Sequence, residues 1–319
     1  MRLLRSEFLR ARSRRLVPML IVAGLLGIVV ALGIAAFTVE RPTDAEVATA
    51  QARYTKNLDR CLSSDYTQDG GFVPSAQYAS AEEYCQRTSA PSVTGVQLRD
   101  LDVIVQGIST FVALLGVVLG TSLGGADWTN NTMTTLLTWE PRRARVFFTR
   151  ALVVAVTVGA ITAFLQVVFC AVYALVAAAV GTTLFLPSHF WTDLAATIGR
   201  VSVIAMALGL VGYVLAMIGR STVSSLGAMF GYLILFEGVI AGFRPTIQGN
   251  LLVRAASVIV SQQPIVDPTR ELVSTGSGVS VAATPAILMD VQRAWTVVVV
   301  YVVVLGAISL VQYQRRDVT

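Results

Sequence analysis

Few residues in this chain could take part in covalent or metal chemistry. Cys61 and Cys85 lie 24 residues apart in one polar segment, Cys170 lies inside an apolar run, and His189 is the single histidine. Because no CxxC spacing and no second histidine occur, the sequence argues against a zinc site and against a haem held by two histidines. Cys61 and Cys85 are candidates for a disulfide, and two free thiols in a loop are the alternative.

Motifs for catalysis and nucleotide binding are also missing from the sequence. No GxSxG occurs, and His189 stands beside Phe190 and Trp191, a setting typical of a membrane-interface anchor rather than of a general base. No GxxxxGK[ST] occurs, so the chain lacks a P-loop for ATP phosphates. We therefore expect no enzyme activity, no catalytic residue, no metal and no cofactor on this chain. If the chain is energised by ATP, a separate polypeptide must bind the ATP and magnesium.

The composition is that of a membrane protein. The chain has 319 residues, of which 55% are hydrophobic and 13% are charged, whereas soluble domains carry about 25% charged residues. The net charge is +5, but the arginines cluster at the ends of apolar runs and form no basic stripe interleaved with aromatics. This distribution fits the positive-inside rule better than nucleic-acid binding.

The apolar runs predict an all-α integral membrane protein with six transmembrane helices, since about 20 apolar residues cross a bilayer as a helix. In chain order we expect an amphipathic cytoplasmic helix at 1–15, spans at 16–37, 103–123, 146–180, 194–218, 224–243 and 295–311, an extracytoplasmic domain at 38–102, a cytoplasmic loop at 124–145, an extracytoplasmic segment at 244–293 and a cytoplasmic tail at 312–319.

Charge asymmetry orients these spans. Six arginines precede the first apolar run, which places the N-terminus in the cytoplasm. A cleaved signal peptide is the alternative for this run, but its 22 residues are long for an h-region of roughly 7–15. The tract 146–186 could be forced into two spans, but no turn signal divides it, and two spans would export Arg220 and the basic tail. We therefore expect one long helix, with both termini cytoplasmic.

The stretch 124–150, GGADWTNNTMTTLLTWEPRRARVFFTR, interrupts the apolar sequence. Gly-Gly can end or bend a helix, Asn130 to Thr132 are cap-prone, and Pro141 ends a helix. Between them, Met133, Leu136 and Leu137 share one helical face. An ordinary cytoplasmic loop would explain the arginines but not Trp128, Trp139 and the paired leucines, which favour a contact surface for another protein.

The same stretch resembles the intracellular loop of ATP-binding-cassette exporter permeases of the type-2 membrane-domain family. In that family an acidic residue, a Gly-Thr, a Leu-Leu, a Pro and two basic residues recur at similar spacing. The residues that carry the resemblance are Asp127, Asn131, Thr132, Leu136, Leu137, Glu140, Pro141, Arg143 and Arg150. The chain differs in having Asp127 for Glu, Asn131 for Gly and Arg150 for Lys. The N-terminal amphipathic helix, the six-span order and the basic tail are also similar.

The resemblance implies a role for this loop. Its short helix would be the coupling helix, seated in a cleft of a separate P-loop ATPase, and closure of two ATPases on ATP would push on it. Because six spans are few for an alternating-access pathway, we expect a second permease chain, identical or homologous. The resemblance also implies an exporter in a bacterial cell membrane; the substrate and the direction of transport are not encoded in any single motif.

Besides Arg150, which lies near the start of the third span, two charged residues lie inside predicted spans. Arg200 and Glu237 each lie roughly 10 Å below the outer edge of a span, at 1.5 Å per residue. Because intramembrane charges are costly, we predict that they form an ion pair; the alternative for Arg200 is a side chain that reaches the outer headgroups. Glu237 and Gly238 are also consistent with a helix break.

The sequence features are compatible with three functions. The first is the permease subunit of an ATP-driven transporter, and the second is a membrane-anchored scaffold or sensor with an extracytoplasmic domain and no transport activity. The third is a secondary transporter, which usually shows repeated halves and central acidic residues that this sequence lacks. The loop and the spans favour the first.

Overall fold

The computed structural model describes residues 6–10, 14–63, 80–129, 142–266, 273–274, 280–281 and 287–315. These residues are mostly helical, in agreement with the all-α membrane fold that the sequence predicts. Contacts within the chain define two compact units. Unit 1 comprises Met1–Pro18, Ser109–Thr162 and Arg200–Thr319, and unit 2 comprises Met19–Ile108 and Ala163–Gly199.

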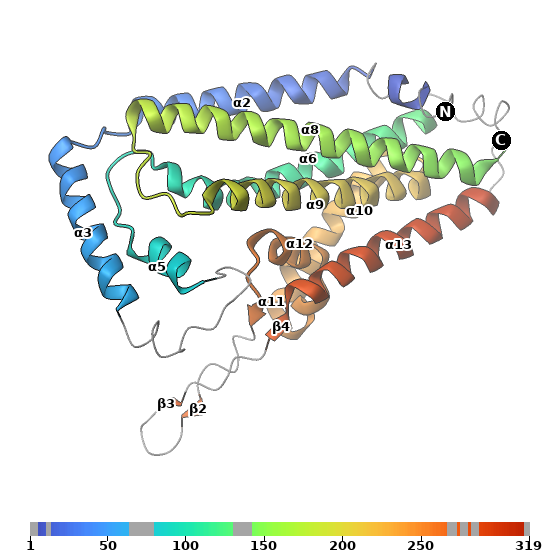
Figure 1. Ribbon diagram of the computed structural model, residues 1–319. Coiled ribbons are helices and arrows are strands. Elements are labelled where there is room, and N and C mark those ends of the chain that lie inside the picture. The colour runs from blue at the N-terminus through green and yellow to red at the C-terminus, as the bar shows by residue number, and fades with distance from the viewer. Residues whose placement is uncertain are drawn as a thin grey trace. The chain divides into compact units, whose positions relative to one another are not determined.

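Six helical segments in the described part of the chain are long and apolar enough to cross a membrane. They are α2 (Leu16–Thr38), α6 (Leu101–Thr129), α8 (Arg143–Val180), α9 (Phe190–Gly219), the segment from α10 to α11 (Thr222–Phe243) and α13 (Val291–Arg315). Figure 1 shows them as the long ribbons of the chain. Residues 146–180 therefore lie in one helix, α8, which has 38 residues and ends at Val180.

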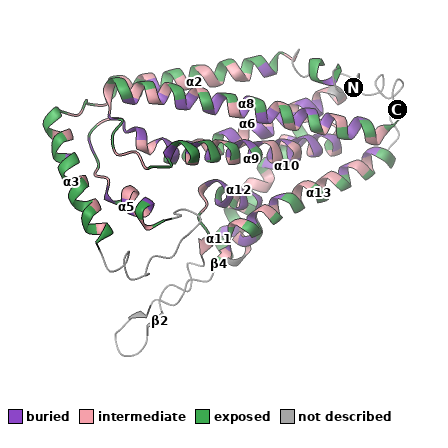
Figure 2. Cartoon of the chain, in the orientation of Figure 1, coloured by how far each residue is buried: buried purple, intermediate pink, exposed green. Residues whose placement is uncertain are grey.

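The first span shows how apolar composition maps onto exposure. Helix α2 has no charged residue, and among its side chains only Val17 and Leu32 are buried. Figure 2 shows the rest of α2 as exposed or intermediate. A helix that is apolar all round and exposed over most of its surface is suited to contact with lipid.

Unit 2 carries the polar insertion between the first two spans. Helix α3 (Asp44–Leu62) begins after Thr43, whose side chain accepts a hydrogen bond from the Glu46 amide, and α5 (Ala81–Ser89) begins after Ser80, which caps the Glu83 amide. A short 3₁₀ turn, η1 (Leu98–Asp100), leads into α6. Such caps satisfy amides that a helix start leaves unbonded, and each contributes roughly 1 kcal/mol.

The core of unit 2 lies where α6 and α8 pass this insertion. Leu101, Val105 and Ala177 are fully buried there. The Tyr173 hydroxyl donates a hydrogen bond to the Gln97 carbonyl oxygen at 3.0 Å. This bond ties η1 to the body of α8, so the polar insertion is joined to the apolar helices rather than suspended from them.

In unit 1, α6 and α9 approach closely because glycines face the contact. A Cβ atom added at Gly116 would lie 2.6 Å from the Ala205 carbonyl oxygen, and one added at Gly120 would overlap the backbone of Gly209. Small residues let helix backbones approach in this way inside membranes, where packing and weak polar contacts replace the hydrophobic effect as the force between helices.

The end of α6 differs from the sequence expectation. The span was placed at 103–123, with Gly124 and Gly125 opening the cytoplasmic loop, but α6 continues through both glycines to Thr129. The reason is tertiary: a Cβ at Gly124 would meet Tyr213, and a Cβ at Gly125 would meet Thr222. These glycines permit close packing, and they do not terminate the helix.

The fifth span is irregular. Helix α10 (Thr222–Tyr232) continues into a π-helix, η2 (Leu233–Ile240), and then into the short α11 (Ala241–Phe243). The π segment contains Glu237 and Gly238. Segments of π-helix are rare and are often found at functional sites.

The rest of unit 1 packs around the last span. The 3₁₀ segment η3 (Pro245–Asn250) leads into α12 (Leu252–Ser261), which buries Leu252, Ala255 and Ile259 and packs against α13. Two short antiparallel pairs follow, β1 (Ile265–Val266) with β4 (Ile287–Met289) and β2 (Val273–Ser274) with β3 (Ser280–Val281). Figure 1 shows α12 beside the N-terminal part of α13.

Candidate functional site

The loop that the sequence singled out is bounded on one side by Trp128, in the last turn of α6. The guanidinium carbon of Arg220 lies 5.0 Å from the centre of the Trp128 ring. The indole Nε1 donates a hydrogen bond to the Met217 sulfur at 3.4 Å, and the ring meets Tyr313 edge-on at 6.4 Å. A cation over a Trp face is worth about 0.5–2 kcal/mol, so α6 ends in a fixed position.

The other end of that loop begins at Arg143, the first residue of α8. Its Nη1 donates hydrogen bonds to the carbonyl oxygens of Tyr313 and Gln314, each at 3.2 Å. The last carbonyls of a helix carry partial negative charge and lack partners inside the helix, so an arginine there satisfies both. Residues 130–141 are thus bounded on both sides by residues that contact Tyr313.

Aromatic side chains that are buried next to these two contacts link α8, α9 and α13. The Tyr213 hydroxyl donates to the Phe147 carbonyl oxygen at 3.2 Å, and the two rings lie 5.6 Å apart. Phe147 also lies 6.3 Å from the ring of Tyr313. We name Trp128, Arg143, Phe147, Tyr213, Arg220 and Tyr313 the loop-anchor cluster. Its members come from α6, α8, α9, the turn after α9 and α13, so each of these helices contributes to the position of the loop ends.

The N-terminal segment is fastened to α8 nearby in unit 1. Residues 6–10 are helical, and Glu7 Oε2 lies 3.3 Å from Nε of Arg150. The two side chains are 8% and 5% exposed, so this is a buried ion pair. Arg10 lies 3.2 Å from the other Glu7 oxygen, and Arg14 donates to the Ser122 carbonyl oxygen of α6 at 3.0 Å.

The predicted coupling residues are placed only in part. Trp128 and Arg143 lie in the loop-anchor cluster, and the backbone of Asp127 is in α6. The side chain of Asp127 lies outside the described residues, and so do Asn131, Thr132, Leu136, Leu137, Trp139, Glu140 and Pro141. The short helix predicted between them therefore stays a prediction.

Three contributors to this region were not identified from the sequence as site residues. Arg220 was assigned only to orientation, Tyr313 to the tail and Glu7 to the amphipathic helix. A signal existed for Glu7, which is the single acidic residue among the first 15 and so the natural partner for a buried arginine. Arg220 has φ of 52°, a left-handed position after α9 that glycine usually fills, and no sequence pattern predicts it.

The structure gives Glu237 partners other than the predicted Arg200. Both residues are described, and Glu237 Oε1 instead accepts hydrogen bonds from the Val253 amide at 2.6 Å and the Tyr232 hydroxyl at 3.1 Å. The Leu252 amide donates to the Tyr232 hydroxyl oxygen at 2.9 Å. Arg200 lies half-buried in α9.

The physical reason is that α12 begins beside the π-helix. The first amides of a helix have no partners inside it and carry partial positive charge, so they attract a carboxylate. Glu237 satisfies one of these amides directly and a second through Tyr232. The hydroxyl of Tyr301 extends the network, with a hydrogen bond to the Asn250 carbonyl oxygen at 3.3 Å. Capping of α12 thus accounts for the partners of Glu237 Oε1.

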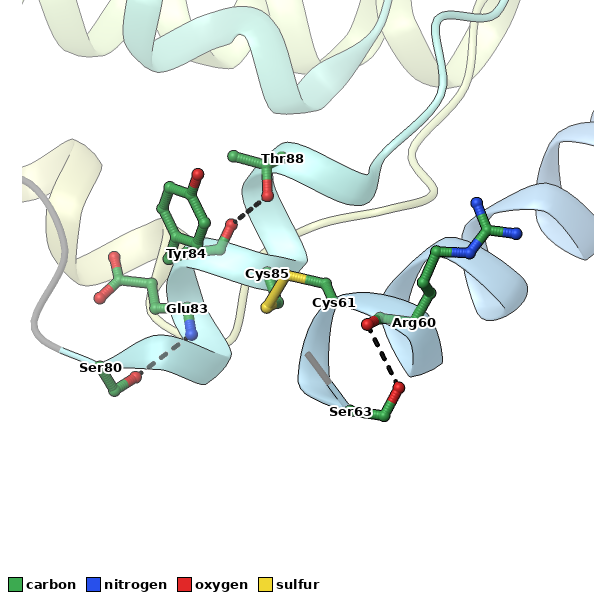
Figure 3. Close-up of a disulfide and its surroundings, with 8 residues drawn as sticks. All are labelled: Arg60, Cys61, Ser63, Ser80, Glu83, Tyr84, Cys85 and Thr88. Atoms are coloured by element: carbon green, nitrogen blue, oxygen red, sulfur yellow. Dashed lines mark hydrogen bonds between the residues drawn. A yellow bond between two sulfur atoms is a disulfide. The ribbon is translucent and has the colours of Figure 1, made fainter. Parts of the chain in front are cut away.

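The two cysteines of the polar segment form a disulfide. Cys61, in the last turn of α3, is bonded to Cys85 of α5, and Cys85 is fully buried. Figure 3 shows the bond between the two helices, with the Ser80 cap at the start of α5. A bond across 24 residues restricts the unfolded chain and commonly contributes about 2–4 kcal/mol.

A second link holds the start of α3. Glu46 Oε1 accepts hydrogen bonds from the Thr94 hydroxyl at 2.6 Å and from the Thr94 amide at 2.8 Å. These bonds from the Thr94 side chain and backbone lower the pKa of Glu46 below its ordinary value of 4.5. The segment before η1 is therefore fastened to α3 by charge-assisted hydrogen bonds.

No cluster suited to metal binding is found among the described residues. Unit 1 contains an apolar pocket of ≈ 150 Å³ between α6, α9, η2 and α12, lined by Val117, Leu208, Leu233 and Val260 among others.

Comparison of the chain with protein-family models, curated proteins and solved structures finds no match. The physical arrangement therefore carries the functional argument.

Proposed function

We propose that this chain is the membrane-spanning permease subunit of an ATP-driven transporter of the ATP-binding-cassette type, working as an exporter. The chain would form part of the translocation pathway and would receive force from a separate P-loop ATPase subunit. Six spans and the absence of a P-loop from the sequence support this assignment. ATP and magnesium would bind on the partner.

The observation that carries the proposal is the common attachment of both loop ends. Trp128 and Arg143 bound the segment 130–141, and both contact Tyr313 at the end of α13. A docked ATPase can move a helix bundle only if the docking loop is held firmly to the helices. The loop-anchor cluster holds this loop to α6, α8, α9 and α13 together.

Helix α8 suits the role of a lever. Its 38 residues extend about 57 Å at 1.5 Å per residue, well beyond a hydrocarbon core of about 30 Å. The helix begins at Arg143, so displacement of the loop would act directly on its first turn. The pair of Glu7 with Arg150 would carry the same displacement to the N-terminal segment.

We further propose how the chain is oriented in the membrane and that it pairs with a second permease chain. The arginine-rich segment before α2 and the loop-anchor cluster would face the bacterial cytoplasm, and both termini would lie there. The disulfide would then lie outside, in a compartment that permits one. A second permease chain, identical or homologous, would complete the pathway, and apolar helix faces would line it.

The direct test starts from the reading frames beside this one: a P-loop ATPase found there would be co-expressed with this chain and reconstituted with it in nanodiscs. We expect the complex to co-purify and the permease to change the ATPase rate. The variant Leu136→Asp plus Leu137→Asp places two charges on the apolar face of the predicted loop helix. It should abolish co-purification, because a charge buried without a partner costs several kcal/mol.

The matched control is Thr135→Asp plus Thr138→Asp, which adds the same charge to the opposite face of that predicted helix at 100° per residue. It should leave co-purification intact. Equal loss in both double variants would mean that charge alone, and not the apolar face, weakens the complex. Full binding by the Leu136 and Leu137 variant would contradict the proposal and favour a scaffold or sensor without an ATPase.

A further inference from the structure

A polar pocket of ≈ 280 Å³ lies in unit 2, at the start of α6 and α9. Its lining combines two arginines and two aspartates with an apolar wall: Arg87, Ala90, Arg99, Asp100, Asp102, Val103, Phe185, Pro187 and Phe190. This size suits a small polar molecule or a headgroup, because pockets for drug-sized ligands begin near 300 Å³. None of these residues belongs to the loop-anchor cluster.

Arg87 is already engaged by protein carboxylates. Its Nη2 lies 2.7 Å from Asp193 and 3.6 Å from Glu83, and its Nη1 lies 3.9 Å from Asp102. The disulfide positions this arginine, since Cys85 precedes it by two residues on α5, and Figure 3 shows Cys85 and Glu83 on this helix. Arg87 therefore forms one fixed wall of the pocket.

Asp102 is also satisfied by the protein. Its two oxygens accept hydrogen bonds from the Thr197 hydroxyl at 2.8 Å and from the Gln106 amide nitrogen at 3.0 Å. With Arg87 nearby as well, this carboxylate has little capacity left for a ligand. The pocket's free capacity for charge must come from its other two charged side chains.

Arg99 and Asp100 form that remaining pair. Arg99 Nε is 3.5 Å from Asp100 Oδ1, and among the described residues Arg99 Nε is buried without a hydrogen-bond partner. The side chains are 18% and 48% exposed. The guanidinium edge of Arg99 can bind an anion in a bidentate manner, and the Asp100 carboxylate can accept a bond from an ammonium group.

We infer that this pocket binds a ligand in which a phosphate stands close to a primary ammonium, the chemistry of phosphoethanolamine. The phosphate would bind to Arg99 and the ammonium to Asp100. An anion alone would leave the Asp100 carboxylate beside it uncompensated, and a cation alone would lie beside the Arg99 guanidinium. Only a ligand of both signs matches both groups.

The apolar wall indicates how such a ligand would enter. Val103 is 67% exposed at the start of α6, and Phe190 is buried at the start of α9 beside the exposed Trp191. Tryptophan and exposed aliphatic side chains at the start of a span are typical of the membrane interface. The headgroup of a phospholipid would meet the pocket at that level, and free phosphoethanolamine has the same polar chemistry.

The backbone of Phe185, in the apolar wall, is strained, which indicates that the surrounding structure holds the pocket in place. Phe185 has φ of 62°, and its ring packs 5.1 Å from Tyr54 of α3. A left-handed conformation of a bulky residue costs about 1–3 kcal/mol and persists only where the surroundings enforce it. Here it keeps an aromatic side chain at the pocket.

The first arm of the test is calorimetry on the purified full chain in detergent. It measures the binding of free phosphoethanolamine, with inorganic phosphate and ethanolamine as separate probes. The lipid arm uses native mass spectrometry of the chain in nanodiscs, and it measures whether phosphatidylethanolamine is retained in preference to phosphatidylglycerol. Arg99→Gln and Asp100→Asn should each weaken binding at least about tenfold, since each removes a charge-assisted hydrogen bond. Binding in the first arm identifies a soluble ligand, and binding in the lipid arm alone identifies the lipid.

The control is Arg53→Gln, which removes an exposed arginine from α3 of the same unit and should leave binding unchanged. Thermal unfolding of every variant, together with the intact disulfide, establishes that the pocket is folded. Inorganic phosphate binding as tightly as phosphoethanolamine would overturn the inference. So would the lack of binding in both arms, or equal binding by wild type and both pocket variants.

Discussion

The loop-anchor cluster of unit 1 and the disulfide-linked insertion of unit 2 both use arginines to fasten helix ends, but with different partners. In the cluster, Arg143 binds two carbonyl oxygens and Arg220 covers a Trp ring. In the insertion, Arg87 lies between three carboxylates, and a covalent bond holds its helix to α3. The first arrangement is shared among several helices, whereas the second locks a single short helix.

The two kinds of contact permit different amounts of motion in the two regions. Carbonyl and aromatic contacts are individually weak, so a cluster built from them can shift as a group when one helix is displaced. A disulfide and a multiply bonded arginine keep their geometry until α5 itself unfolds. The proposed function needs the first property where the ATPase would dock and the second where a pocket must keep its shape.

The largest effect is expected in unit 1. Arg150→Gln leaves the buried Glu7 carboxylate with the exposed Arg10 and without its buried partner, and removal of one member of a buried pair costs about 3–5 kcal/mol. Thermal unfolding of the full chain in detergent should show this loss. Arg142→Gln, at an exposed position just before α8, is the control. Similar stability for both variants would mean that the N-terminal segment is not anchored through Arg150.

An intermediate effect is expected in unit 2. Cys61→Ala plus Cys85→Ala should cost about 2–4 kcal/mol and should expose α3 and α5 to limited proteolysis while the spanning helices stay protected. Reductant should reproduce the result in the wild type and add nothing to the double variant. Proteolysis that begins equally in the spanning helices would show that the insertion and the bundle unfold together, which would weaken the contrast between the two regions.

The smallest effect concerns the link between Glu46 and Thr94. Because the folded-state pKa of Glu46 is lowered, its stabilising contribution is present above the ordinary value of 4.5 and is lost as pH falls through the lowered pKa. The stability difference between wild type and Glu46→Gln should therefore be present at neutral pH and shrink in acid. Glu40→Gln, at an exposed carboxylate before α3, should show less pH dependence. A difference that grows in acid would contradict this assignment.

Some features could be read directly from local pattern. The single long helix over 146–180 follows from an apolar tract without a turn signal, and two cysteines in one polar segment made Cys61 and Cys85 candidates for the disulfide that they form. Other features could not be read, because they depend on residues brought together from far along the chain. The continuation of α6 past Gly124 and Gly125 is one of them, since these glycines lie against Tyr213 and Thr222.

By itself the sequence determined that six helices can cross a membrane, since twenty or so apolar residues have no favourable alternative to burial in lipid or protein. The sequence also places an acid, Glu237, within the fifth span. The partners come from tertiary contacts: Glu237 accepts a hydrogen bond from the first turn of α12, and Tyr313 contacts both ends of the loop. Hydrogen bonds and ring contacts act over a few ångströms, so their pairing is fixed by where distant helices begin and end, which local sequence does not specify.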